Sequence, residues 1–189
     1  MQETEERIRA HLARGEHDEA ATAILEGYGP ALFGYLCSLL DEDDAKDAFA
    51  IAAEDVWRGI GGFRGDATAR AWAYRVAWHA AARFSRDAYR RRRERLPSSA
   101  ASRLAASAIS QSALLPGSRR DRLRKLRASL AADEQTLLVL RVDRELEWEE
   151  IAAVLAGDGE EIEAAALRKR YERLKDKLER LAREQGLLD

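Results

Sequence analysis

Apolar residues near the C-terminus follow the spacing of an α-helix, and this periodicity most constrains the fold. The residues fall at i, i+4, i+7, i+11 and i+14: Leu167, Tyr171, Leu174, Leu178 and Leu181. Side chains at these intervals form one stripe along a helix. Alanine, leucine, arginine and glutamate dominate the rest of the chain, and no segment alternates convincingly with the period of two typical of a strand. The sequence therefore predicts an all-α protein.

Glycine and proline divide the first half of the chain into separate helices. We expect two short helices around Gly15, and then a helix that opens at Pro30, because a first helical turn tolerates proline. Asp43 or Asp44 is expected to cap the next helix, which runs to about Ile60. Gly61-Gly62 then end this helix. After the loop FRGDAT, the pattern predicts a long helix from Ala69 to Arg95.

A serine- and alanine-rich segment interrupts the helical pattern in the middle of the chain. It begins at Pro97 and ends at Pro116-Gly117, and its composition is typical of a flexible linker. The predicted organisation is therefore two small helical domains, 1–96 and 121–189, joined by a linker over 97–120.

Charge is segregated along the sequence. Charged residues make up 35% of the chain, yet the net charge is −2. Residues 41–55 are acidic and residues 83–95 are rich in arginine, a pattern that suits a nucleic-acid partner. A sequence pI near 6.0 argues against a protein that coats DNA indiscriminately.

The sequence offers no constellation for catalysis. Cys37 is the one cysteine, so a disulfide framework or cysteine-rich zinc site is excluded, and we expect its side chain to be buried. The histidines His11, His17 and His79 are scattered, and no glycine-rich phosphate loop is present. We therefore predict a protein that is not an enzyme and needs no metal or cofactor. Without a signal peptide or membrane span, we expect it to be soluble and cytoplasmic.

The C-terminal domain carries a helix-turn-helix pattern. Asp133 is expected to cap a helix to about Asp143, Trp148 to Leu155 form a short helix, and Gly157 and Gly159 force a turn before the final helix. On that helix, small residues precede basic ones, which suits entry into a DNA major groove: Ala165, Ala166, Lys169, Arg170 and Arg173. The alternative is a plain amphipathic helix with a solvated basic face.

Aromatic rings and guanidinium groups share the helix that precedes the linker. Trp72, His79 and Arg83 fall on one side of it, together with Val76 and Arg86. Arginines can meet phosphates while aromatic rings stack on unpaired bases, as in proteins that hold single-stranded nucleic acid. The alternative is that the tryptophans belong to the core and the arginines only solubilise the helix.

In order, the two domains resemble those of an extracytoplasmic-function sigma factor, a promoter-recognition subunit of bacterial RNA polymerase. YGPALFGYL, DAKDAF, VWRGIGGFRG and ARAWAYRVAWHAAARFSRD resemble successive parts of the sigma-2 domain. DEQTLLVLRVDRELEWEEIAAVLA and LRKRYERLKDKL resemble the sigma-4 helix-turn-helix. The chain departs from the family at Ala50 and Ile51, where a Gln-Glu pair is usual, at His79, where asparagine is common, and in a longer turn between the last two helices.

The resemblance implies core RNA polymerase and promoter DNA as partners, and allows an anti-sigma factor. It implies that the loop FRGDAT receives a flipped base, and that the −10 strand meets Arg64, Trp72, Arg75, His79, Arg83 and Arg86. Contact with core polymerase would involve Asp47, Glu54, Asp55 and Trp57. The −35 duplex would be read by Ala165, Ala166, Lys169, Arg170 and Arg173.

Two other functional classes stay open at this point. One is a helix-turn-helix regulator that binds duplex DNA without core polymerase, and the other is a helical protein-interaction module. The helix rich in tryptophan and arginine favours the sigma factor, because a simple repressor needs no surface for single-stranded DNA. The sequence does not specify the promoter, the regulon or the inducing signal.

Overall fold

All elements in the described part of the chain are helical, as a computed structural model shows. The structure describes residues 2–86, 129–156 and 161–184, and contains no strand within these ranges. This confirms the all-α prediction. The chain divides into two compact units, Met1–Ala113 and Leu114–Asp189. The predicted linker over 97–120 lies outside the described residues, and so does the predicted continuation of the arginine-rich helix beyond Arg86.

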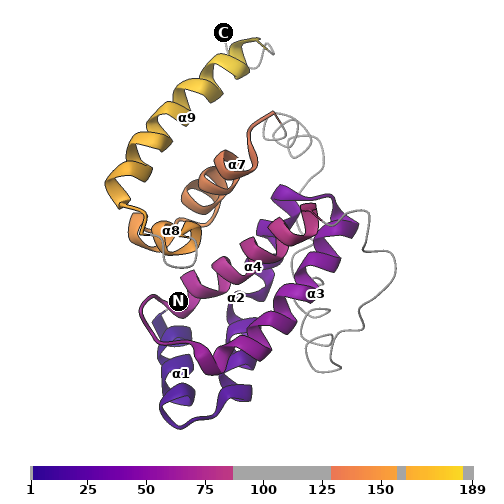
Figure 1. Cartoon of the computed structure of the whole chain (residues 1–189), viewed down its shortest axis with the longest axis vertical. Helices are drawn as coiled ribbons and strands as arrows, with labels where there is room; N and C mark the ends of the chain where they lie inside the picture. Colours follow the sequence, from indigo (N-terminus) through magenta and orange to yellow (C-terminus); the bar gives the residue numbers. More distant parts are fainter. Residues whose placement is uncertain (1, 87–128, 157–160, 185–189) are drawn as a thin grey trace. The chain divides into compact units, whose positions relative to one another are not determined.

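The first unit is a bundle around one long central helix (Figure 1). Its elements are α1 (Gln2–Ala13), α2 (His17–Leu39), α3 (Glu42–Gly59), the 3₁₀ turn η1 (Ile60–Gly62) and α4 (Ala69–Arg86). Helix α2 packs against α1, α3 and α4, and α3 also packs along α4. The expected loop FRGDAT therefore connects η1 to the start of α4.

Helix α2 runs through Pro30, whereas the sequence predicted a new helix there. Proline cannot donate a hydrogen bond to the carbonyl of Glu26, and its ring normally clashes with the β-carbon of the preceding residue. Residue 29 is glycine and has no β-carbon, so this clash is absent here. One of the usual costs of proline inside a helix is therefore removed.

The start of α3 is capped by Asp41, two or three residues before the expected Asp43 or Asp44. The Asp41 side chain accepts a hydrogen bond of 2.9 Å from the backbone N–H of Asp44. Asp43 and Asp44 instead lie in the first turn, where negative charge is favourable beside the positive end of the helix dipole. The sequence thus predicted correctly that an aspartate caps α3, but it indicated the wrong aspartate.

The core of the first unit combines alanine faces with a few large aromatic rings. Buried alanines on α3 and α4 recur at helical spacing: Ala45, Ala48, Ala52, Ala53, Ala73, Ala77, Ala80 and Ala81. Tyr35 and Tyr74 meet edge to face with centroids 5.6 Å apart, and Phe33 and Phe49 do so at 5.7 Å. Cys37 is half-buried rather than buried, which corrects the expectation for that residue.

The second unit contains α7 (Ala132–Leu138), the π-helical turn η2 (Val139–Asp143), α8 (Trp148–Leu155) and α9 (Ala164–Glu184) (Figure 1). Asp133 is not the cap of α7 but a first-turn residue; the cap position is Ala131, whose N–H donates to the Glu134 carboxylate at 2.9 Å. The apolar stripe of α9 packs on the helices before it, with Leu167 and Leu174 buried and the rings of Tyr171 and Trp148 5.5 Å apart. The expected turn at Gly157 and Gly159 lies outside the described residues.

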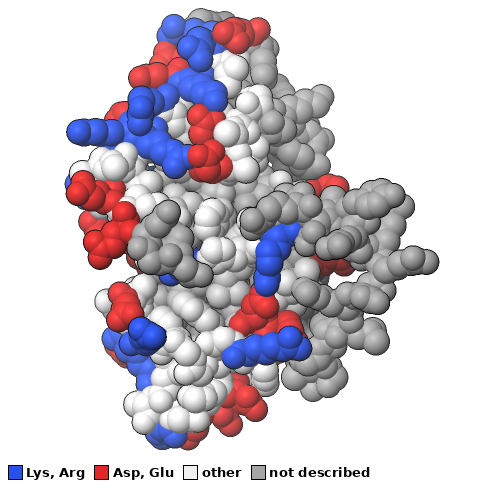
Figure 2. Space-filling view, in the orientation of Figure 1, with Lys and Arg blue, Asp and Glu red and all other residues white. Residues whose placement is uncertain are grey.

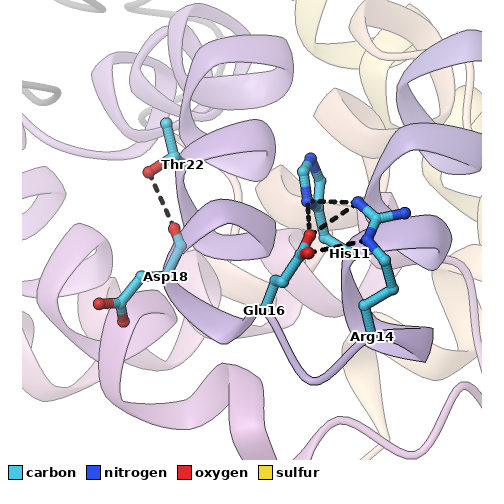
Figure 3. A network of polar contacts seen from close by, with 5 residues as sticks. All are labelled: His11, Arg14, Glu16, Asp18 and Thr22. Atoms are coloured by element: carbon cyan, nitrogen blue, oxygen red, sulfur yellow. Dashed lines mark hydrogen bonds and ion pairs between the residues drawn. The ribbon is translucent and has the colours of Figure 1, made fainter.

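An ion-pair network closes the corner between α1 and α2 (Figure 3). The Glu16 carboxylate accepts hydrogen bonds from Arg14, at 2.8 Å from Nε and 2.7 Å from a terminal nitrogen, and lies 2.7 Å from Nδ1 of His11. In the next turn, the Thr22 hydroxyl donates to the Asp18 carbonyl at 2.8 Å. The hydrogen bond from Arg14 and, to a smaller extent, the one with His11 lower the pKa of Glu16 to about 2.

Replacing Glu16 with glutamine should destabilise the protein at neutral pH. The lowered pKa means that the charged Glu16 stabilises the folded state above the ordinary pKa of 4.5, and that this contribution is lost as the pH falls towards about 2. Urea unfolding measures the free energy of unfolding of the wild type and the variant across this pH range. The difference between the two free energies should shrink to nothing as the pH falls. Glu6→Gln, an exposed carboxylate on α1, is the control and should show no such dependence. A Glu16→Gln difference that is constant with pH would contradict the network.

Candidate nucleic-acid and polymerase interface

Helix α4 has a buried face and, opposite to it, a half-exposed face that carries the candidate −10 residues. The buried face consists of Ala73, Tyr74, Ala77, Ala80, Ala81 and Phe84. At 100° per residue, the opposite face holds Trp72, Arg75, Val76, His79 and Arg83. Arg83 is exposed and the other four are half-buried. The structure therefore brings these candidates onto one outward surface, whereas the side chain of Arg86 lies outside the described residues.

Trp72 anchors the beginning of this face to its neighbours. Its ring lies 5.4 Å from the ring of Phe63, between centroids, and covers Gly59 at the end of α3. A β-carbon at Gly59 would lie 3.3 Å from the Trp72 ring, a tight contact that the ring could relieve only by shifting slightly. One part of the ring therefore packs on the protein while the remainder stays accessible. The sequence had left open whether Trp72 belongs to the core or can stack on bases, and a half-buried ring is compatible with both.

The loop before α4 is open to solvent at its centre. Arg64, Gly65 and Asp66 are exposed, and Gly65 has a φ of 79°, a left-handed conformation that favours glycine. At the end of the loop, the Thr68 hydroxyl accepts a hydrogen bond of 3.0 Å from the N–H of Ala71 and so caps α4. The loop thus leaves Arg64 accessible beside a firmly capped helix.

Arg83 forms an ion pair with Asp55 of α3. This contact joins a candidate −10 residue to a candidate polymerase residue within the same unit. His79 lies against the neighbouring Trp78, with ring centroids 4.9 Å apart. In the free protein, Arg83 must therefore leave or share Asp55 before it can meet a phosphate.

The candidate polymerase residues of α3 do not form one compact cluster. Asp47 is exposed, and Glu54 lies two turns further along the same face, where it forms an ion pair of 2.8 Å with Arg58. Half-buried Trp57 borders this face, whereas Asp55 lies on the flank towards α4. Asp47 and Glu54 are thus the pair that the helix presents together.

The start of α9 exposes four of its five candidate residues. Ala165, Ala166, Lys169 and Arg173 are exposed, whereas Arg170 is half-buried and forms an ion pair with Asp133 of α7. Along α9, Lys and Arg side chains gather on the surface with acidic side chains between them (Figure 2). A surface of mixed sign favours local contacts over a broad attraction for DNA.

Another contact between α7 and α9 fixes the basic helix. Lys177 lies 2.6 Å from the Glu134 carboxylate, and this hydrogen bond, more than the one from the Ala131 N–H, holds the pKa of Glu134 below its ordinary value. Arg170 and Lys177 therefore serve the packing of α9, and Lys169 and Arg173 face outward.

One residue that contacts the start of α4 was not identified from the sequence. Glu5, on α1, accepts hydrogen bonds from the first backbone N–H groups of α4. It stands in the acidic run MQETEER, where nothing local distinguishes it from Glu3 or Glu6. Its contact with α4 spans more than sixty positions of sequence, and no periodicity or motif gives a signal for such a contact.

Residues 24–93 match the family model of Sigma-70 region 2. The match spans most of α2 and all of α3, η1 and α4, and therefore includes the outward face just described. Sigma-70 region 2 binds core RNA polymerase and melts promoter DNA. The match covers less than half of the chain, and it suggests a sigma factor role in transcription initiation. A search of curated proteins found no match.

Two further observations describe the chemistry of the described residues. None of their helices is long and apolar enough to cross a membrane. Within the same ranges, no three or more His, Cys, Asp or Glu side chains gather as a metal site would require.

Asp55→Asn should raise the affinity of the free protein for single-stranded DNA by about twofold to fivefold. This range corresponds to the free energy that an exposed ion pair typically contributes. The substitution releases Arg83 from its partner on α3. Fluorescence anisotropy with a labelled strand of random sequence, at low salt, measures the change.

Glu54→Gln is the matched control, because it removes the same charge one residue away but releases Arg58 rather than Arg83. Equal gains in the two variants would mean that only net charge matters. No gain for Asp55→Asn would mean that Arg83 does not contact the strand.

Proposed function

We propose that this protein is a bacterial transcription initiation factor of the extracytoplasmic-function type. In this proposal, the first unit binds core RNA polymerase and captures the −10 element, and the second unit binds the −35 element. Core polymerase and promoter DNA are then its partners, and it acts in the cytoplasm without catalytic chemistry of its own.

The observation that carries the proposal is the outward face of α4 within the Sigma-70 region 2 match. Trp72 and His79 offer rings for stacking, and Arg75 and Arg83 offer guanidinium groups for phosphates, on the face opposite the buried alanines. Stacking of a base on an aromatic side chain is worth roughly 1–3 kcal/mol. Arg64, exposed in the preceding loop, is the further candidate for the flipped base.

The second unit supports the −35 part of the proposal through α8 and α9. Small Ala165 and Ala166 at the start of α9 permit close approach to a groove, and exposed Lys169 and Arg173 lie one turn apart beyond them. Lysine and arginine in this position can reach phosphates and guanine edges. In the free protein, Arg170 is paired with Asp133 of α7, so its proposed contribution is to hold α9 in place rather than to contact DNA first.

The polymerase contact is proposed on the outward face of α3. Asp47 and Glu54 present carboxylates there, beside half-buried Ile51 and Trp57. This mixture of charge and apolar surface suits a protein partner better than a nucleic acid, which repels carboxylates. Asp55, on the flank towards α4, lies between the proposed polymerase and DNA faces.

The protein should co-elute with core RNA polymerase on gel filtration when the two are mixed in stoichiometric amounts. Asp47→Lys should weaken this association, because it reverses an exposed charge on the proposed contact face. Glu6→Lys, with the same charge change on an exposed site of α1, should leave it intact. Duplex DNA binding without any association with core polymerase would instead favour a helix-turn-helix regulator.

A further inference from the structure

The start of α4 is held by a carboxylate from a different helix. Oε2 of Glu5 accepts a hydrogen bond from the N–H of Ala69 at 3.1 Å, and Oε1 accepts one from the N–H of Arg70 at 2.9 Å. The hydroxyl of Tyr28, on α2, donates to the same Oε1 at 2.7 Å. One side chain of α1 thus joins three helices, and α1 lies beside the start of α4 in Figure 1.

This carboxylate completes the hydrogen bonding of the first turn of α4. The first four N–H groups of a helix have no partner within it. Here Glu5 accepts from Ala69 and Arg70, and the Thr68 hydroxyl accepts from Ala71 at 3.0 Å. The N–H of Trp72 then donates the first regular helical hydrogen bond, to the Thr68 carbonyl at 3.0 Å. A negative charge is also favourable at the positive end of the helix dipole.

Close packing of α1 on α2 places Glu5 within reach of α4. Gly27 of α2 faces Thr4, and a β-carbon at Gly27 would come within 2.4 Å of the Thr4 methyl group. Ile8 is fully buried, and Arg7 forms an ion pair of 3.2 Å with Glu26. The backbone that carries Glu5 is therefore fixed by contacts on both sides of it.

We infer that Glu5 is a positioning residue for capture of the −10 strand. The inference rests on the proposed function and adds to it a helix that lies before the matched region, which begins at residue 24. Trp72 is the fourth residue of α4, and its own N–H belongs to the capped turn. By fixing this turn, Glu5 sets the end of the 63–68 loop and the direction of the Trp72 ring without contacting DNA.

The test compares Glu5→Gln with Glu6→Gln in the full chain. Glutamine has one acceptor oxygen where glutamate has two, so Glu5→Gln removes the negative charge and leaves one N–H of α4 without its acceptor. Glu6 is exposed on the same helix and loses the same charge when replaced by glutamine. The backbone amide signals of Ala69 and Arg70 in nitrogen-15 NMR should move, and their hydrogen exchange should accelerate, in Glu5→Gln only.

The functional measurement uses each protein bound to core polymerase. Its probe is a labelled single strand selected from a random pool by the wild-type complex. Glu5→Gln should weaken capture of this strand by about threefold to tenfold, the range expected for loss of a helix-capping side chain. Co-elution with core polymerase should be unchanged, which distinguishes positioning of α4 from general destabilisation.

The outcomes separate this inference from the proposed function. If the amide signals move but capture equals that of Glu6→Gln, Glu5 is a structural cap only, and the inference fails. Unmoved amide signals would show that the hydrogen bonds do not form, which also overturns it. If the wild-type complex selects no strand beyond core polymerase alone, the proposed function fails, and the positioning role fails with it.

Discussion

Close packing of alanine faces is the constraint on which the first unit depends. Helices α3 and α4 bury alanines at helical spacing, so their backbones can approach closely along much of their length. The buried face of α4 combines four of these alanines with Tyr74 and Phe84, and the opposite face carries Trp72, Arg75, His79 and Arg83. Larger side chains at these alanines would push α4 away from α3. Trp72 would then lose its close contact with Gly59, where an added β-carbon would lie 3.3 Å from the Trp72 ring.

Intramolecular ion pairs occupy some of the arginines that would meet DNA. Arg83 pairs with Asp55 and Arg170 with Asp133, and acidic side chains lie between the basic ones along α9. A chain with a net charge of −2 has little general attraction for a polyanion. Such a protein would bind DNA weakly by itself and would depend on core polymerase to bring the strand to it, as the proposed function requires.

Periodicity and composition predicted the helices and the outward face of α4, because both follow from local spacing. The same reasoning missed the passage of α2 through Pro30, where Gly29 has no β-carbon to clash with the proline ring. It placed the cap of α3 at Asp43 or Asp44, because several neighbouring aspartates satisfy the same rule and only the backbone geometry selects Asp41. The contact of Glu5 with α4 and the pairing of Arg83 with Asp55 join residues far apart in sequence, which no local pattern can reveal.

Run-off transcription tests the central claim most directly. Core RNA polymerase would be supplied with fragmented bacterial genomic DNA, with and without this protein, and the transcripts would be compared by sequencing their 5′ ends. The account predicts a set of discrete start sites that appear only when the protein is present and that share sequence elements upstream. The same start sites with and without the protein would contradict it.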